Sequence, residues 1–492
     1  MAATRVAHGG GDASAVPAGT AAAGNPDFSA IRAELGLPVE YPSAALSEVE
    51  QTAAQPVLDV ARVDATDLPM VTVDPAGAKD LDQALLIDRR GRRGYRVHYA
   101  IADVAAFVPP GGALDAEVRS RGQTLYLPDG NVPLHPTLLS EGAASLLPEQ
   151  RRPAVLWTID LDRDGTAVGV DVRRAVVRSV ARLDYEGVQQ SLELGAAPPA
   201  VALLPEVGRL RREQAVHRGA IELGPPEQQV ESDGAGGWRL TLRPRLPLEA
   251  FNAEISLLTG MCAAQIMLSG GIGVLRTVPD PEDRTIAALR RSALELGLEW
   301  PDRQTPAEFL SGLDPARPEA LALHVSATRL LRGAGYTVFD GGVPDKVRHA
   351  GIGAAYAHVT APLRRLADRY GTEICLAVHA GREVPEWVRA ALPQLPSAMG
   401  SSDRAAGQVE RACIAQAQAW ALAGRIGDEF TATVLRSGSA GESGEVFVPA
   451  PPVIARCCGD HLSEGQRVRV RLTEADPVQR DVAFEVVAPT PV

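Results

Sequence analysis

Lysine is almost absent from this chain: only Lys79 and Lys346 occur, so nearly all of its 49 basic side chains are arginines. Aromatic residues are also sparse, at 4% of the 492 residues. The net charge of −12 argues against a protein that coats polyanions over its whole surface, although it is compatible with a local basic groove. Any phosphate contact is expected to use the planar fork of a guanidinium rather than the point charge of an ammonium group.

Cysteines and long apolar runs are scarce as well. The five cysteines include no CxxC pair, and their odd number does not indicate a disulfide framework, so we expect a reducing, cytoplasmic environment. No run of 18 uncharged apolar residues occurs, which predicts that no segment spans a membrane. Residues 1–25 are rich in glycine and alanine and lack the pattern of a signal peptide. We expect a monomer in which residues 1–25 form a disordered tail.

Three carboxylates in the stretch VTVDPAGAKDLDQALLI are the most informative feature of the sequence. Asp74 follows a strand-like apolar run, and Asp80 and Asp82 come after a Pro-Ala-Gly turn. In an extended segment Asp80 and Asp82 point to the same side, and Asp74 can fold back toward them across the turn. Such a cluster repels itself unless it holds a cation, and Mg²⁺ is an ion that carboxylates and substrate phosphates bind together. The alternative is an acidic loop exposed to solvent.

The order of strand and helix patterns predicts an α+β protein with a small helical unit in front. Residues 26–60 are expected to form two short helices, which either make a helix-turn-helix-like module or only pack against the neighbouring domain. Residues 61–424 begin with strands, including a predicted β-hairpin in LLIDRRGRRGYRVHYAIADVAAFV, and continue with helices. Strands followed by helices are typical of the α+β class.

Residues 425–492 change character again, because short strand patterns alternate with Gly, Ser and Pro segments. This spacing predicts a small closed five-stranded β-barrel of the OB type. In RVRVRL, Arg467, Arg469 and Arg471 alternate with aliphatic residues, so three guanidiniums would share one face of a strand. Such a stripe suits binding of an RNA backbone, although any half-exposed strand alternates in the same way.

Four blocks of sequence resemble the RNB catalytic domain of the ribonuclease II family of exoribonucleases: DPAGAKDLDQAL, HYAIADVAAFV, TLYLPDGNVPLHPTLLSEGAASLLPEQRRPAV and HVTAPLRRLADRY. They occur in the family's order, and the C-terminal barrel is similar to the OB-type RNA-binding domain that usually follows. The resemblance implies an RNB-type α+β domain over residues 61–424. It also implies a metal-dependent, processive enzyme that degrades single-stranded RNA from its 3′ end to nucleoside 5′-monophosphates.

The same resemblance implies which residues bind metal. Asp74, Asp80 and Asp82 match the family's metal-binding acids, with Mg²⁺ or Mn²⁺ as the ion and Asp82 as the indispensable ligand. Where the family has a fourth acid, this chain has Gln83. An amide oxygen can be a ligand but carries no charge, so we expect the second of up to two ions to bind weakly. Replacing Gln83 with aspartate is therefore predicted to lower the metal concentration that half-maximal activity needs.

Further residues are implied to touch the RNA. Arg364 matches the family's catalytic arginine, whose guanidinium neutralises charge at the scissile phosphate, and Arg365 beside it is expected to bind RNA. Tyr126 matches an aromatic residue that stacks on a terminal base. Leu223 takes the place of the opposing aromatic residue and offers no π-face. Glu254 is expected to accept a hydrogen bond from a ribose hydroxyl, with helix-surface solvation as the alternative.

The departures from the family pattern leave a second function open, namely a catalytically weak or inactive RNA-binding protein on the same scaffold. Gln83 and Leu223 favour this alternative, whereas Asp82 and Arg364 favour the enzyme. A third possibility, a phosphodiesterase for small nucleotides, would leave the RNA-binding barrel without a role.

Overall fold

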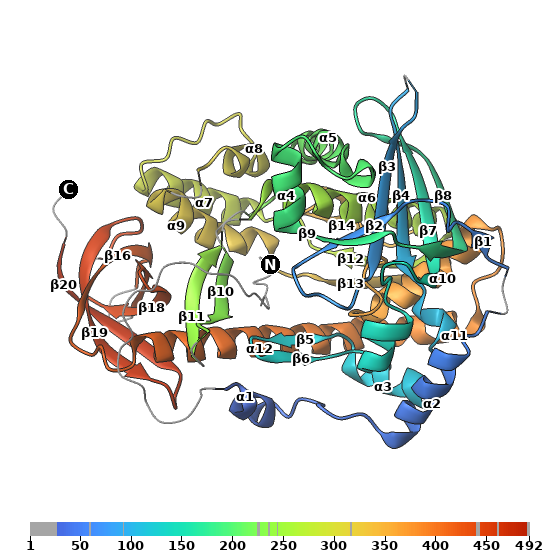
Figure 1. Cartoon of the computed structure of the whole chain (residues 1–492). Coiled ribbons are helices and arrows are strands. Elements are labelled where there is room, and N and C mark those ends of the chain that lie inside the picture. The colour runs from blue at the N-terminus through green and yellow to red at the C-terminus, as the bar shows by residue number, and fades with distance from the viewer. Residues whose placement is uncertain are drawn as a thin grey trace.

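A seven-stranded sheet forms the centre of the computed structural model, which describes residues 27–58, 61–91, 93–223, 227–234, 237–243, 245–314, 317–438, 443–459 and 462–489 (Figure 1). Its strand order is β1-β8-β7-β4-β3-β2-β9. The outer pairs β1–β8 and β2–β9 are parallel, and the other neighbours are antiparallel. The strands are β1 (Val63–Asp64), β2 (Val71–Asp74), β3 (Gln83–Arg89), β4 (Tyr95–Ala102), β7 (Arg151–Leu161), β8 (Ala167–Arg178) and β9 (Ala181–Asp184).

Strands β3 and β4 confirm the predicted hairpin. They pair from Gln83 with Ile101 to Arg89 with Tyr95, so the arginine-rich turn lies at the tip. The basic tip is not a free patch, because Arg89 forms an ion pair with Glu206. Both strands have apolar side chains buried on either side of the sheet. Because both faces are packed, the sheet is a rigid support for the loops at its edge.

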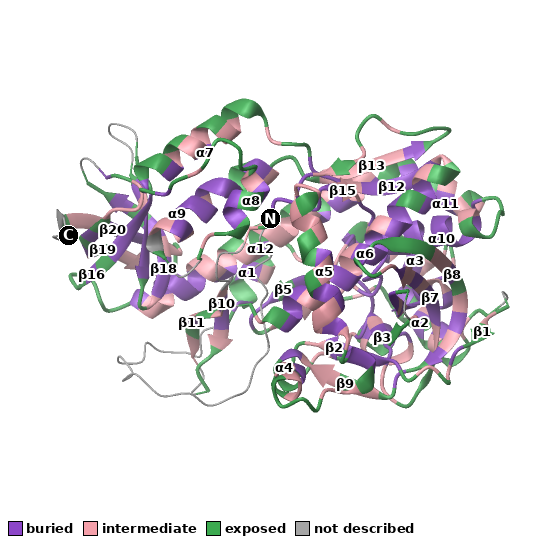
Figure 2. Cartoon of the chain, turned by 90° about the horizontal axis from the view of Figure 1, so that it is seen from above, coloured by how far each residue is buried: buried purple, intermediate pink, exposed green. Residues whose placement is uncertain are grey.

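Helices cover the sheet, and α6 (Pro247–Gly270) and α10 (Leu366–His379) contribute many buried residues to its core. Buried residues concentrate where these helices meet the strands (Figure 2). Helix α6 has the length and composition of a membrane-spanning helix, but 61% of its most apolar window is buried inside the protein, as in the core helices of soluble proteins. The other helices near this domain are α3 (Ala113–Arg121), α4 (Tyr185–Glu193), α5 (Leu204–His217) and α11 (Glu386–Ala391).

The two N-terminal helices, α1 (Ser29–Glu34) and α2 (Ser43–Ala54), pack on different parts of the molecule. Phe28 and Ile31 of the first join the apolar cluster around α12 (Leu395–Leu422) and the barrel. Ala45 and Val49 of the second join the main core, where α2 packs on α3. Of the two arrangements predicted for this unit, packing against the neighbouring domains is therefore the one that these contacts support.

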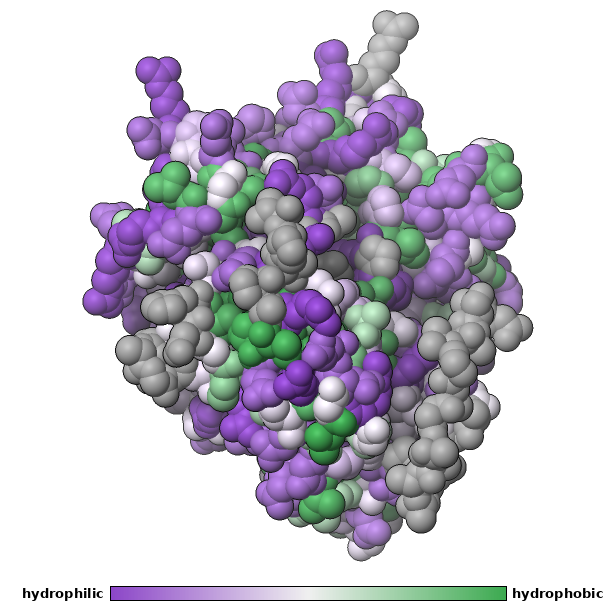
Figure 3. All heavy atoms as spheres, turned by 90° about the vertical axis from the view of Figure 1, so that its left-hand side faces the viewer, coloured by the Kyte–Doolittle hydropathy of each residue, from purple (hydrophilic) through white to green (hydrophobic). Residues whose placement is uncertain are grey.

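The C-terminal strands form a closed barrel in the order β16-β17-β18-β20-β19, as the sequence predicts. Helix α12 runs along the lower side of the molecule in Figure 1 and ends against the barrel. The face that carries the barrel is mainly hydrophilic, with one hydrophobic area near its centre (Figure 3). The barrel strands are β16 (Glu429–Arg436), β17 (Gly444–Pro449), β18 (Pro452–Cys458), β19 (Arg467–Asp476) and β20 (Asp481–Pro489).

Short hairpins and a helical insertion join the two domains. An apolar cluster links helices α7 to α9 to Leu435 and Phe447 of the barrel. The insertion comprises α7 (Asp283–Glu295), α8 (Pro306–Ser311) and α9 (Pro318–Ala327). The hairpins are β5 (Leu125–Leu127) with β6 (Gly130–Val132), β10 (Glu227–Ser232) with β11 (Trp238–Arg243), and β14 (Arg348–His349) with β15 (Ala354–Ala355). The strands β12 (Ile272–Thr277) and β13 (Gly335–Asp340) pair with each other at the two ends of the insertion.

Candidate active site

The acidic loop connects β2 to β3; its turn at residues 75–77 is exposed, whereas Leu81 and Asp82 are buried against the domain. Leu81, between Asp80 and Asp82, is fully buried, and its amide donates to the Ser145 hydroxyl at 3.0 Å. Ser145 in turn donates to the carbonyl of Lys79 at 2.6 Å. Because Leu81 points into the core, its two acidic neighbours face the other way, as the period of an extended segment predicts.

Asp82 is the most buried acid of the loop, with 4% of its surface exposed. The amide of Leu363 donates to Asp82 Oδ1 at 2.8 Å, and Nε of Arg364 lies 3.5 Å from Oδ2. Burial raises the pKa of Asp82 well above its usual value, against the opposing effects of the Arg364 charge and the Leu363 amide. The charge of Asp80 adds to this rise.

The same two influences, burial and the charge of Arg364, act on the pKa values of Asp80 and Asp82. Burial raises the pKa of Asp80, while Arg364 and the hydroxyl of Tyr126 counteract the rise. The Tyr126 hydroxyl lies 3.4 Å from Asp80 Oδ2, and 38% of the Tyr126 residue stays exposed. The structure thus brings Asp80, Asp82, Tyr126 and Arg364 together from three segments that are distant in the sequence.

The segment Thr360–Arg365, which carries Arg364, is held by backbone contacts on both sides. The amide of Thr124 donates to the Arg364 carbonyl at 3.0 Å, and the Leu366 amide donates to the carbonyl of Gly122 at 2.9 Å. His135 Nδ1 lies 3.1 Å from the carbonyl of Leu363. These contacts fix the backbone on which the Arg364 side chain is placed beside Asp82.

The guanidinium of Arg365 is bound by a buried carboxylate of the protein itself. Its Nε and Nη2 donate to Asp368 at 2.9 and 2.8 Å, and Asp368 also accepts from the Ala361 amide at 2.6 Å. Asp368 is fully buried. The expected contact of Arg365 with RNA stays a prediction, because the side of its guanidinium that suits a phosphate already binds Asp368. Asp368 is a residue that sequence reasoning missed, although it lies three positions after Arg365.

Gln83 bridges three elements. Its Nε2 donates to the Thr360 carbonyl at 2.5 Å, and its Oε1 accepts from the hydroxyl of Tyr99 at 2.5 Å. Tyr99 is 1% exposed and lies 2.7 Å from the Ser256 hydroxyl on α6. Since both ends of the amide are engaged, its contacts favour a positioning role over the weak metal ligation predicted from the sequence. Tyr99 and Ser256 were not identified from the sequence, because only strand pairing and helix packing bring them to Gln83.

This bridge changes the result we expect from Gln83→Asp. Aspartate is shorter and has no N–H group, so the Thr360 carbonyl would lose its donor at a cost of about 1–3 kcal/mol. We expect a lower melting temperature and an unchanged Mg²⁺ requirement, measured by thermal unfolding and by titrating activity with the ion. Gln83→Glu, which keeps the length and lacks the donor, is the matched comparison. A several-fold lower Mg²⁺ requirement in Gln83→Asp would show that residue 83 reaches an ion.

The fit of this site to a metal rests on two carboxylates. Among the described residues, no three His, Cys, Asp or Glu side chains gather into a group that could hold an ion. Asp80 and Asp82 nevertheless fit, because Asp82 is buried, Asp80 beside it is half-buried, and burial raises the pKa of both carboxyls. Mg²⁺ is commonly held by one or two carboxylates together with substrate phosphates. Asp74, at the end of β2 where it pairs with Asp184 of β9, stays a predicted ligand.

The other predicted contacts lie around this centre. Leu223 packs against the apolar cluster of α7 to α9. Glu254 on α6 is 6% exposed, not solvated on the helix surface, and burial raises its pKa. It lines a cavity of about 570 Å³ whose wall also includes Arg218, Arg245 and His358. His358 lies two residues before the segment that carries Arg364, so one lining residue of this cavity is close in sequence to the candidate site.

The arginine stripe of the barrel alternates with buried residues as predicted, but it is partly neutralised. Arg467 and Arg469 are exposed, while Val468 and Val470 are buried. Glu429 on β16 forms ion pairs with Arg469 and Arg471, the latter at 3.0 Å. Arg471 also lies 3.2 Å from Glu485.

His135 should make the stability of the fold depend on pH. Burial lowers the pKa of His135 to about 4, so below its usual pKa of about 6.5 the unfolded chain binds a proton that the folded chain does not. Stability is therefore fully present above about pH 6.5 and falls as the pH drops toward 4, by at most about 3 kcal/mol from this residue. Denaturant unfolding of His135→Asn across this range should show a smaller decrease than the parent. The exposed His379→Asn serves as the control, and an unchanged pH dependence in His135→Asn would contradict the prediction.

Two known protein families match this chain. The RNB domain family matches residues 62–377, and the RNase II-type exonuclease C-terminal S1 domain matches residues 428–487. Ribonuclease R of Escherichia coli is 31% identical over 325 residues, which are 62% of this chain and 39% of that protein. The chain thus spans less than half the length of this curated relative.

Solved structures share the fold. Mycoplasma genitalium RNase R in complex with ribose-methylated single-stranded RNA matches with a TM-score of 0.83 and 21% identity, over 94% of this chain and 77% of that one. Yeast Ssd1, described as a pseudonuclease, matches with a TM-score of 0.68 and 18% identity, over 87% of this chain and 54% of that one. Because the RNB match spans more than half of the sequence and the S1 match follows it, the chain belongs to the RNase II-type family of RNB-domain proteins.

Proposed function

We propose that this chain is a metal-dependent, processive 3′-to-5′ exoribonuclease that hydrolyses single-stranded RNA to nucleoside 5′-monophosphates. The observation that carries the proposal is the buried carboxylate of Asp82, held by the Leu363 amide beside Asp80 and Arg364. Two neighbouring acids, one buried and one half-buried, whose pKa values are both raised are the arrangement expected of a hydrolytic centre in a family of this kind.

The carboxylates would hold the ion, and the fold keeps them in place. When bound by Asp80, Asp82 and a substrate phosphate, Mg²⁺ or Mn²⁺ would supply positive charge to the transition state and help to activate water. The Leu363 amide fixes the orientation of the Asp82 carboxylate. The buried Leu81 keeps Asp80 and Asp82 on one side of the loop. The second ion stays a prediction, since Gln83 is engaged by Tyr99 and Thr360.

Arg364 is placed to bind the scissile phosphate. Its Nε faces Asp82 at 3.5 Å, and its side chain is 33% exposed. The remaining N–H groups can donate to phosphate oxygens and neutralise the charge that develops there. One guanidinium thus joins the acidic pair to the substrate, which a lysine could not do with the same geometry.

The RNA strand itself would be held by Tyr126 and by the cavity beside Glu254. The Tyr126 hydroxyl is directed at Asp80, and its exposed ring can stack on the terminal base, a contact worth about 1–3 kcal/mol. Arg218 and Arg245 line the cavity, where they could contact phosphates. The buried Glu254 carboxyl in the same wall could bind a ribose hydroxyl and so favour RNA over DNA.

The arginine stripe of the barrel would supply a second basic surface, and its affinity for RNA would depend on Glu429. Glu429→Gln should release Arg469 from its ion pair and remove one of the two acids that pair with Arg471, so we expect tighter binding of single-stranded RNA. The plot of log affinity against log salt should steepen by about 0.7 for each guanidinium that gains a phosphate. Fluorescence anisotropy over a salt series measures both effects, with Glu464→Gln on the same domain as the control. An unchanged salt slope would show that the stripe does not bind RNA.

Degradation of single-stranded RNA, labelled at its 5′ end in one sample and along its whole length in another, tests the function in the presence of Mg²⁺ or Mn²⁺. We expect mononucleotide release, progressive shortening from the 3′ end, and protection when the 3′ end is blocked. An excess of unlabelled RNA added after the start should not stop a chain already being degraded. Failure to release mononucleotides with either ion would refute the enzyme.

The second candidate function is RNA binding with little or no catalysis. It is favoured by Gln83, a bridging residue that stands where the family has a fourth acid, and by the likeness of the fold to that of Ssd1. RNA binding without shortening in the same assay would support it. The cytoplasmic location and the monomeric state stay predictions from the sequence.

A further inference from the structure

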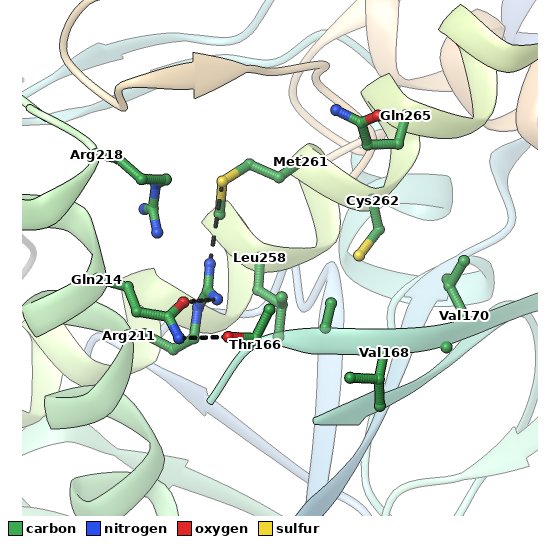
Figure 4. Close-up of a pocket in the computed structure, with 12 residues that line it drawn as sticks. Thr166, Val168, Val170, Arg211, Gln214, Arg218, Leu258, Met261, Cys262 and Gln265 are labelled. Atoms are coloured by element: carbon green, nitrogen blue, oxygen red, sulfur yellow. Dashed lines mark hydrogen bonds between the residues drawn. The ribbon is translucent and has the colours of Figure 1, made fainter. Parts of the chain in front are cut away.

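A second cavity of about 430 Å³ lies between β8, α5 and α6 (Figure 4). Leu258, Met261 and Cys262 of α6 line it. Helical spacing puts these residues on the side of α6 opposite Ser256, which contacts the active-site residue Tyr99. The cavity thus lies on the other side of α6 from Ser256, and it shares Arg218 with the cavity beside Glu254.

Two arginines face each other in this cavity without a carboxylate partner. Arg211 is 4% exposed; its Nη1 donates to the Gly165 carbonyl at 2.9 Å and to Gln214 Oε1 at 2.7 Å. Its Nη2 has only the sulfur of Met261 at 4.0 Å, and its buried Nε has no hydrogen-bond partner. The guanidinium of Arg218 points toward it (Figure 4).

The charges of these arginines are not balanced by a close acid. Within the described parts of the chain, neither Arg211 nor Arg218 forms an ion pair, and Glu254 acts on both from beyond ion-pair distance. Burial lowers the pKa of Arg211, and repulsion from Arg218 lowers it further. The buried guanidinium of Arg211 and the half-buried one of Arg218 would both be stabilised by one oxyanion between them.

We propose that this cavity binds a small organic anion with one oxyanionic headgroup and an apolar body. The headgroup, a carboxylate or a phosphate monoester, would lie between Arg211 and Arg218. The body would lie against the apolar side chains that make up most of the wall, and the volume is in the range of small-molecule sites. The apolar wall is formed by Ala167, Val168, Val170, Leu258 and Met261.

Calorimetry on the full-length chain without RNA can distinguish two kinds of ligand that carry such a headgroup. Octanoate represents an aliphatic carboxylate, AMP represents a nucleotide, and inorganic phosphate represents the headgroup alone. We expect saturable one-site binding of octanoate or of AMP, and binding of phosphate that is about tenfold weaker or more, because it cannot use the apolar wall.

Variants of the lining residues test whether the ligand binds in this cavity. Arg218→Met, at a partly exposed position, should weaken the bound ligand by about tenfold or more. Ala167→Trp enlarges an exposed residue of the wall and should block the cavity. Arg212→Met is the matched control on the same helix, since Arg212 lies 3.6 Å from Glu222 and does not line this cavity. The proposal is overturned if neither octanoate nor AMP binds saturably, or if Arg218→Met and Ala167→Trp bind as the parent does.

Discussion

Replacing Asp82 with asparagine should abolish hydrolysis while RNA binding persists or tightens. Asparagine has the same shape and can still accept from the Leu363 amide, so the loop should keep its fold. It lacks the negative charge that would hold the ion and that faces Arg364. We expect the single-turnover rate to fall by at least about a thousandfold. Removing a negative charge from the path of a polyanion should leave affinity equal or higher.

The matched control for this variant is Asp88→Asn. Asp88 lies on β3, the strand that follows the acidic loop, and it is exposed. Cleavage of labelled RNA and fluorescence anisotropy with the same strand separate rate from affinity. A parent-like rate in Asp82→Asn would show that the buried acid is not part of the chemistry, whereas loss of both rate and binding would indicate a folding defect.

Adjacent arginines should give opposite results when each is replaced with methionine. Arg364→Met should lower the rate by about 100- to 1000-fold with little change in melting temperature. The Arg364 side chain is 33% exposed and lies 3.5 Å from Asp82, so its removal takes away a charge at the candidate site without opening the core.

Arg365→Met should instead destabilise the fold. It would leave the fully buried carboxylate of Asp368 without its cation, which costs about 3–5 kcal/mol for a buried pair. Thermal unfolding of both variants, together with cleavage rates at a temperature where both are folded, distinguishes the two roles. A rate defect confined to Arg365→Met, or an unfolding defect confined to Arg364→Met, would reverse the assignment of these neighbours.

Local patterns in the sequence were sufficient to predict much of this architecture. The alternation in LLIDRRGRRGYRVHYAIADVAAFV predicted the β3–β4 hairpin, and the short strands after residue 425 predicted the closed barrel. The spacing of Asp80 and Asp82 around Leu81 placed both acids on one side of the loop. These features depend on the periods of strands and turns, which neighbouring residues set by themselves.

The sequence by itself determined the family, the order of the elements and the acids and arginine that stand at the candidate site. Only the tertiary structure decided which of these groups are engaged: Gln83 by Thr360 and Tyr99, Arg365 by Asp368, and Arg469 by Glu429. Most of these partners are separated by many residues, so no local period relates them. Their contacts arise because the packing of strands and helices sets which groups lie within hydrogen-bonding distance of each polar side chain, and that packing is a property of the whole fold.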